Sequence, residues 1–162
     1  MYSCGRFKIA AALVGTLSLF PTFSTAITAP TMGELPLSSS GRWIVDANGD
    51  KIPIVGVNWP GAADTMLPEG LQYQSIETIV SKISGLGLNA VRLTFAIEMV
   101  DDILDGGGDV SLATTLGNAL GTTNGTVVLQ EILANNPQFT SNTTRLQVRL
   151  AFLDLCLGFG FY

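Results

Sequence analysis

Two short apolar segments separated by one amphipathic helix pattern constrain the fold of this chain more than any other feature. Residues 54–58 and 89–95 are short and rich in β-branched side chains, as is typical of parallel strands buried on both faces. Between them, Ser75 is suited to cap a helix, and apolar residues follow at the spacing of one helical face: Ile76, Ile79, Val80 and Ile83. The order predicts an α/β fold in which a crossover helix joins two parallel strands.

The N-terminus carries a pattern of export rather than of folding. Arg6 and Lys8 precede an apolar run over residues 9–20, and small residues follow up to Ala26. The run is shorter than the ~20 residues that a membrane-spanning helix needs. We therefore predict a secretory signal peptide over residues 1–26, cleaved after Ala26, and a secreted, extracellular product without a membrane anchor.

The rest of the chain divides into a leader and one domain. Residues 27–40 are rich in proline, glycine and serine, which predicts a flexible leader. Residues 41–162 are expected to form a single domain that begins with a β-hairpin. In that hairpin, residues 43–45 and 51–54 would pair around 46–50, where an Asn-Gly pair supplies the positive φ angles of a tight turn.

Beyond the second strand, the pattern becomes helical with one interruption. Residues 101–110 contain three consecutive glycines and are predicted to be a loop. Helical patterns follow over three segments: 112–120, 127–134 and 144–157. Residues 158–162 resemble the first residues of a third strand. Two and a half parallel strands cannot close a barrel, which takes about 250 residues.

Charge and cysteine content restrict the class of partner and the compartment. The formal net charge of −5 at pH 7 argues against a nucleic-acid partner, because phosphates require clustered Lys and Arg. After signal cleavage, which removes Cys4, only Cys156 remains, and a lone cysteine in an oxidising compartment indicates that partner sequence is missing. Two sequons predict glycosylation at Asn124 and Asn142.

Two longer segments carry a family resemblance. SSSGRWIVDANGDKIPIVGVNWPGA and LPEGLQYQSIETIVSKISGLGLNAVRLTFAIEMV resemble the opening of secreted, fungal-type glycoside hydrolase family 5 proteins of the cellulase-like clan. The resemblance covers residues 37–162 and implies a (β/α)8 TIM barrel with its active site at the carboxyl ends of the strands. The chain is then expected to be an incomplete barrel: the leading β-hairpin plus the first two to three βα units.

The resemblance also implies roles for three residues. Arg92 matches the family arginine that lies beside the catalytic nucleophile and keeps it ionised, although an arginine near a strand end also serves as a structural ion-pair partner. Asn58 and Trp59, at the end of the first strand, would face the same substrate-binding mouth. Trp59 is equally suited to stack on a sugar ring and to anchor packing.

The family's two catalytic glutamates have no counterpart in this sequence. Retaining glycosidases need two carboxyl groups about 5 Å apart, and the family supplies them from strands four and seven. No Asn-Glu-Pro segment occurs here, and the chain contains no histidine. Glu98 follows the second strand but is interpreted as a solvated loop carboxylate. The other glutamates beyond the signal have ordinary explanations in the leader, in a loop or on helix faces: Glu34, Glu69, Glu77 and Glu131.

No metal or cofactor is expected. The acidic pattern at residues 46–50 lacks the bidentate glutamate of a calcium loop, because the required position is Val57. A second group of acidic residues is interpreted as solvated loop: Asp101, Asp102, Asp105 and Asp109.

The leading hypothesis is therefore a family 5-like glycoside hydrolase that acts on O-glycosyl bonds of a β-glucan or related polysaccharide, as a monomer. Because this chain lacks both catalytic glutamates, we expect it to be inactive alone. The alternative is a non-catalytic secreted carbohydrate-binding or interaction remnant of a decayed hydrolase. A complete small α/β domain of unrelated function is a third possibility.

Overall fold

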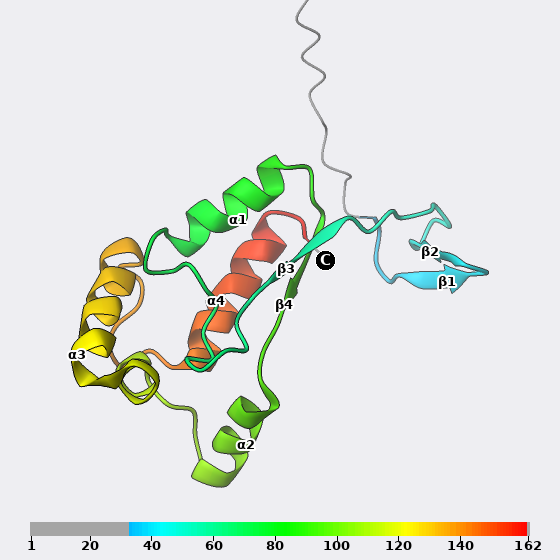
Figure 1. Ribbon diagram of the computed structural model, residues 1–162. Helices are drawn as coiled ribbons and strands as arrows, with labels where there is room; N and C mark the ends of the chain where they lie inside the picture. Colours follow the sequence, from blue (N-terminus) through cyan, green and yellow to red (C-terminus); the bar gives the residue numbers. More distant parts are fainter. Residues whose placement is uncertain (1–32, 162) are drawn as a thin grey trace, which may run out of the picture.

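A computed structural model describes residues 33–161, so the predicted signal peptide, residues 27–32 of the predicted leader and Tyr162 lie outside the described residues. The helices α1 and α4 lie on one side of the strands β3 and β4, while β1 and β2 lie apart from the helices (Figure 1). The elements in chain order are β1 (Ser38–Ser40), β2 (Trp43–Val45), β3 (Gly56–Trp59), α1 (Ile76–Gly85), β4 (Ala90–Leu93), α2 (Ile97–Gly106), α3 (Leu112–Asn135) and α4 (Arg145–Gly158).

The predicted strand, helix and strand are confirmed. β3 and β4 pair in parallel, with Gly56 opposite Ala90 and Trp59 opposite Leu93, and α1 makes the crossover between them. The Ser75 hydroxyl accepts the backbone N–H of Thr78 at 3.1 Å, which satisfies one of the free donors of the first helical turn. The crossover unit is thus specified by local sequence signals.

The expectation that both faces of these strands are buried is wrong among the described residues. Side chains alternate across the pair, and Val91 and Leu93 of β4 pack against the core together with the buried Trp59. We call this side the covered face. The opposite side presents exposed Asn58 and Arg92, and we call it the open face. Helices of residues 33–161 cover one side only, and this is why the other side is exposed.

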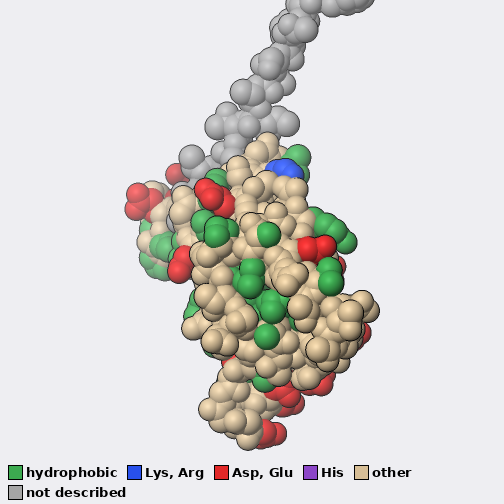
Figure 2. Space-filling view, turned by 90° about the vertical axis from the view of Figure 1, so that its left-hand side faces the viewer, with side chains coloured by type: hydrophobic (Ala, Val, Ile, Leu, Met, Phe, Trp, Pro, Cys, Tyr) green, Lys and Arg blue, Asp and Glu red, His purple; other side chains and the backbone are tan. Residues whose placement is uncertain are grey.

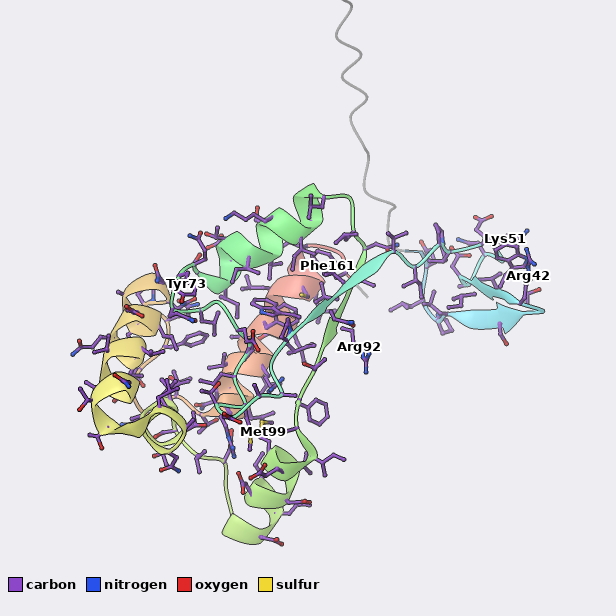
Figure 3. All side chains as sticks on the ribbon, viewed as in Figure 1. Arg42, Lys51, Tyr73, Arg92, Met99 and Phe161 are labelled. Atoms are coloured by element: carbon purple, nitrogen blue, oxygen red, sulfur yellow. The ribbon has the colours of Figure 1, made fainter. Side chains whose placement is uncertain are left out.

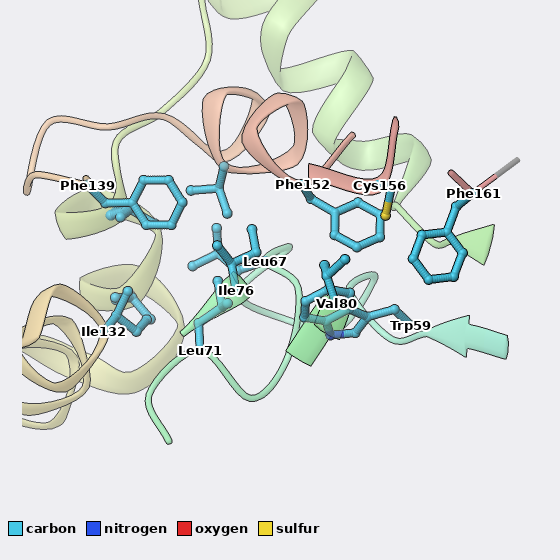
Figure 4. Packing of buried hydrophobic residues seen from close by; sticks show 13 residues of the cluster. Trp59, Leu67, Leu71, Ile76, Val80, Ile132, Phe139, Phe152, Cys156 and Phe161 are labelled. Carbon is cyan, nitrogen blue, oxygen red and sulfur yellow. The ribbon is translucent and has the colours of Figure 1, made fainter. Parts of the chain in front are cut away.

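The core lies between the covered face, α1, α4 and both parts of α3 (Figure 4). Leu71, Ile76 and Val80 are fully buried, and Phe152 of α4 meets Trp59 edge to face with ring centroids 4.7 Å apart. Such edge-to-face contacts add about 0.5–1.5 kcal/mol to the burial of the rings. The two helices therefore hold the strand pair through large, well-packed side chains.

The predicted hairpin forms in part, and an additional strand pairs with its first half. β1 pairs antiparallel with β2, Ser38 opposite Val45 and Ser40 opposite Trp43, so the turn lies at residues 41–42, where Gly41 has φ of 59°. On its other side, β2 meets the residues after the predicted turn: Val45 and Lys51 form an antiparallel bridge, and the Ile52 N–H donates to the Ile44 carbonyl at 2.9 Å. Ordered structure therefore begins inside the range predicted as a flexible leader.

Asp46 explains why residues 46–50 form a compact turn of their own. Its carboxylate accepts backbone N–H groups from Asn48 and Asp50 at 2.9 Å each and from Glu34 at 3.2 Å. Burial raises the pKa of Asp46, but these donors lower it more, so the pKa lies below its ordinary value. The predicted pairing of residues 51–54 stops after Ile52, because Pro53 offers no N–H and its carbonyl accepts from the Asn89 side chain instead.

The prediction of a loop over residues 101–110 is also wrong for most of that range. α2 continues to Gly106 and ends at Gly107, whose φ of 72° gives the left-handed conformation common after a helix. Met99 is buried on the inner side of α2, whereas the acidic residues of this helix are largely exposed. The glycines therefore terminate a helix rather than form a long loop.

The later helices agree with the predicted pattern, but the third strand does not. α3 contains non-helical Gly121, which separates the two predicted helical stretches. Thr144 and Gln147 form a capping box at the start of α4. At the other end, Gly160 has φ of 75° and Phe161 turns back into the core, where its N–H donates to the Cys156 carbonyl. Residues 158–161 are thus a helix terminus.

Within residues 33–161, none of the helices combines the length and the hydrophobicity needed to cross a membrane.

Candidate functional site

The carboxyl ends of β3 and β4 bring two of the sequence-predicted residues together. Asn58 and Arg92 are register partners on the open face, and both are exposed. The Arg92 side chain points away from α4 (Figure 3). Because ligands of parallel α/β sheets bind beyond the carboxyl ends of the strands, this edge is the candidate site.

The Arg92 side chain makes no hydrogen bond or ion pair within residues 33–161, whereas its backbone belongs to the β3–β4 pairing. The alternative role of a structural ion-pair partner is therefore not seen among the described residues, and the guanidinium group is free to bind a carboxylate. A planar guanidinium offers two parallel N–H donors to such a group. Its role beside a catalytic nucleophile stays a prediction.

Trp59 occupies a different environment from Asn58 and Arg92. Its side chain is only 5% exposed, its Nε1–H donates to the Glu69 carbonyl at 2.8 Å, and its ring packs on Phe152. Of the two interpretations, this geometry favours the packing anchor over a stacking platform on the open face. Successive side chains of a strand point to opposite faces, and Trp59 follows Asn58 directly.

Two of the acidic residues predicted to be solvated pair with a buried arginine, and of these the Asp109 side chain is only 6% exposed while the Asp102 side chain is still 45% exposed. Asp109 accepts from Nε of Arg145 at 2.7 Å, and Asp102 accepts from Nη1 of the same guanidinium at 3.0 Å. Arg145 is only 2% exposed, so the charge requires these partners. Glu98 is exposed on α2, in a helix rather than in a loop.

Sequence reasoning missed a second buried arginine, Arg149, one turn further along α4. Its guanidinium donates to three backbone carbonyls that follow the strands: Gly61, Met66 and Thr94. Burial lowers the pKa of Arg149, the charge of Arg145 lowers it further, and Asp109 partly offsets this. The spacing of residues along α4 could have indicated their burial, since both arginines lie on the same side of the helix as buried Val148, Phe152 and Cys156.

Cys156 is free and buried within the described chain. Burial raises the pKa of its thiol to about 11, because the apolar surroundings disfavour the thiolate. The neutral thiol is a packing group rather than a nucleophile.

The two sequons occupy accessible positions. Asn124 is exposed on α3, just after Gly121, and Asn142 is exposed in the turn before α4. Glycosylation at either residue stays a prediction. In the part of the chain that the structure describes, no group of three or more His, Cys, Asp or Glu side chains has an arrangement that could hold a metal ion.

Comparison with known proteins finds similarity both by sequence and by structure. No family model matches the chain. The chain is 41% identical over 85 residues to a glycosyl hydrolase 5 family protein of Chamaecyparis obtusa, a match that covers 52% of this chain and 15% of that protein. The chain is therefore similar to a family 5 protein over about half of its own length.

Three solved structures with a similar fold are an endoglucanase and two endocellulases. The catalytic domain of the major endoglucanase of Xanthomonas campestris pv. campestris has a TM-score of 0.53 and 19% identity, over 78% of this chain and 30% of that one. A hyperthermostable endocellulase has a TM-score of 0.53 and 20% identity, over 83% of this chain and 30% of that one. An endocellulase of Pyrococcus horikoshii, solved in complex with cellotetraose, has a TM-score of 0.51 and 21% identity, over 83% of this chain and 30% of that one.

The likeness to these structures establishes the fold. The described residues have the arrangement of a segment of an endoglucanase and contain no closed barrel. The chain spans about 30% of the length of the solved endoglucanases and 15% of that of the sequence relative.

Proposed function

We propose that this chain forms the first βα units of a (β/α)8 glycoside hydrolase of family 5, of the secreted fungal type, which hydrolyses β-linked glucan. The observation that carries the proposal is the Asn58–Arg92 pair on the open face, at the carboxyl ends of parallel strands whose fold is that of an endoglucanase segment. The sequence relative supports the family, and the cellotetraose complex of a structural relative supports the substrate class.

In this proposal, the open face is the interior of the barrel, and Arg92 binds the carboxylate of a nucleophile from a later strand. An arginine within about 4–6 Å lowers the pKa of a carboxyl group by 1–3 units, which keeps the nucleophile ionised. Asn58 supplies a hydrogen bond at the same edge. Neither catalytic carboxylate of a retaining mechanism has a counterpart in the printed sequence, so we propose no turnover by these residues alone.

A chimera tests the barrel role directly. The matching 85-residue segment of the Chamaecyparis obtusa protein is replaced by the corresponding segment of this chain, and release of reducing sugar from soluble β-glucan is measured. We expect an active chimera. Arg92→Met should move the acidic limb of its kcat/KM profile upward by about 1–3 pH units, because the nucleophile loses its cationic neighbour.

Arg42→Met is the matched control, since Arg42 is an exposed arginine of the hairpin that contacts Trp43. It should leave the pH profile unchanged. An inactive but folded chimera, or identical profiles for both arginine variants, contradicts the proposed role. Release of sugar by the isolated chain would contradict the proposed lack of turnover.

Export is part of the proposal. Expression in a eukaryotic secretory host should yield a medium-borne product that begins at Ile27 and carries N-glycans at Asn124 and Asn142. Amino-terminal sequencing and the mass lost in Asn124→Gln and Asn142→Gln variants check these positions. Retention of residues 1–26, or a product confined to the cells, would contradict secretion.

A further inference from the structure

Two cavities meet on the loop that joins β3 to α1. The larger, of about 660 Å³, lies between this loop and α3. The smaller, of about 530 Å³, lies between the loop, α2, α3 and the start of α4. Both volumes fall within the range of about 300–1,000 Å³ that small-molecule sites occupy. Asp64 lines both cavities, and neither Asn58 nor Arg92 lines either one.

The larger cavity offers an aromatic and apolar surface. Tyr73, at its rim, is 72% exposed, and Trp59 forms part of the wall. The loop adds further apolar groups, among them Leu67, and α3 supplies Leu116, Leu120, Val128 and Ile132. A large exposed ring beside an apolar wall suits the flat hydrophobic face of a sugar ring, because the ring adds contact area with little conformational freedom to lose.

The smaller cavity offers hydrogen-bond acceptors. Asp64, Glu98 and Asp102 bring carboxylates from the loop and from α2, and Asn118 adds a side-chain amide. Nη2 of buried Arg145, a residue that lines this cavity, has no hydrogen-bond partner in the described chain. Carboxylates accept strong hydrogen bonds from hydroxyl groups, so a polyhydroxylated ligand matches this lining.

The wall between the cavities is held by specific contacts. The Thr115 hydroxyl donates to the Thr65 carbonyl at 2.7 Å, and Arg149 donates to the Met66 carbonyl at 3.1 Å. Met66 itself has φ of 51°, a strained conformation for a side chain of this kind. At the far rim, the Asn135 amide donates to the Gln72 carbonyl at 2.7 Å, which anchors the backbone next to Tyr73. The surface is therefore preorganised, which lowers the cost of binding.

The charge of this region narrows the class of ligand. The side of the molecule that carries α1 and α3 shows hydrophobic side chains near its centre and acidic ones towards the lower end, where α2 lies (Figure 2). Excess carboxylate disfavours phosphates and other anions. No metal-binding group exists among residues 33–161. A neutral ligand with one apolar face and many hydroxyl groups satisfies both cavities.

We propose that the two cavities form one groove for a neutral β-linked oligosaccharide, which crosses Asp64 with its apolar ring faces towards Tyr73 and its hydroxyl groups towards Glu98 and Asp102. The sugar class rests on the proposed function, whereas the groove itself is separate from the open face. It is a binding site outside the site of Arg92. It holds a glucan chain without cleaving it.

Cellotetraose is the probe, and the full chain carrying Trp43→Phe is the reporter. The sequence has two tryptophans, so this variant leaves Trp59 of the larger cavity as its sole tryptophan. We expect a saturable change in Trp59 fluorescence and a matching heat in isothermal titration calorimetry. Tyr73→Ala should weaken binding about tenfold, and Tyr73→Phe should retain it, because the ring makes the contact.

Asp64→Asn should weaken binding several-fold through loss of a charged acceptor, whereas Glu131→Gln, an exposed carboxylate of α3 outside the groove, should not change it. Circular dichroism confirms that each variant is folded. Absence of saturable binding, or binding that Tyr73→Ala leaves intact, overturns the groove. Binding of a glucosamine tetramer in place of cellotetraose overturns the neutral class.

The proposed hydrolase role and the proposed groove can be contradicted independently of each other. Binding that is lost in Arg92→Met but kept in Tyr73→Ala places the sugar on the open face, which overturns the groove and leaves the proposed function standing. An inactive chimera together with Tyr73-dependent binding of cellotetraose overturns the hydrolase role and leaves the groove standing.

Discussion

The covered and open faces of the β3–β4 pair are built from alternate residues of the same two strands, yet their environments differ sharply. Trp59 and Leu93 on the covered face pack beneath α1 and α4, whereas Asn58 and Arg92 on the open face are exposed. Burial of large apolar groups supplies the stability of the fold. The difference shows that the covered face stabilises the fold through burial, whereas the polar side chains of the open face are not needed for packing and can bind a ligand.

The largest expected effect belongs to the covered face. Phe152→Ala removes a ring that is 1% exposed and contacts Trp59. It should cost about 3–5 kcal/mol of the free energy of unfolding, measured by urea denaturation. Leu153→Ala, at an exposed neighbouring position of α4, should cost less than about 1 kcal/mol. Equal costs would mean that the covered face is not the main source of stability.

The next effect tests how α4 holds the segments that follow the strands. Arg149→Met leaves the carbonyls of Gly61, Met66 and Thr94 without their donor. We expect a loss of about 2–3 kcal/mol in unfolding free energy and faster hydrogen exchange of the Glu69 amide, which donates to Pro60. Arg149→Lys should recover part of both. Unchanged exchange in Arg149→Met would show that the loop is held by other contacts.

The pH dependence of the buried Cys156 thiol gives a third test of the covered side of the molecule. Its pKa of about 11, against 9.0 for an unperturbed thiol, should slow alkylation by iodoacetamide at pH 8 about 100-fold relative to the unfolded chain. Because the folded pKa is raised, the stability contribution is complete below pH 9 and is lost as the pH rises towards 11. Cys156→Val should remove this alkaline dependence. Rapid alkylation of the folded chain would contradict the burial of the thiol.

The smallest effect belongs to the open face. Arg92→Ala removes an exposed side chain without a partner in the described chain, and the unfolding free energy should change by less than about 0.5 kcal/mol. Thermal and urea denaturation check this value. A loss comparable to that of Arg149→Met would reveal a structural ion pair at Arg92 and remove the distinction between the faces.

Elements with strong local signals could be predicted from the sequence. Ser75 and Thr144 both begin helices as capping residues, and the crossover between β3 and β4 follows from helix periodicity and β-branched runs. The turn at residues 46–50 was predicted, whereas the strand at residues 38–40 was not, because three serines lack the apolar alternation that marks a strand. The end of α2 was misjudged because glycine marks helix ends as well as loops.

The candidate site divides in the same way. Arg92 and Asn58 could be placed at the carboxyl ends of strands from the sequence, because strand direction follows from the order of elements. The groove could not, since Asp64, Tyr73 and Glu98 come from segments that only packing brings together. Arg145 and Arg149 were missed because arginine is usually a surface residue, although their spacing matched the buried stripe.

By itself, the sequence determined the parallel strand–helix–strand unit, its caps and the arginine at the end of β4, because these depend on interactions between residues close along the chain. Only the tertiary structure decided which face of the strands is covered, where the buried arginines find their partners, and that Phe161 turns inward to the core. These features depend on contacts between distant segments, which residue patterns do not encode one element at a time.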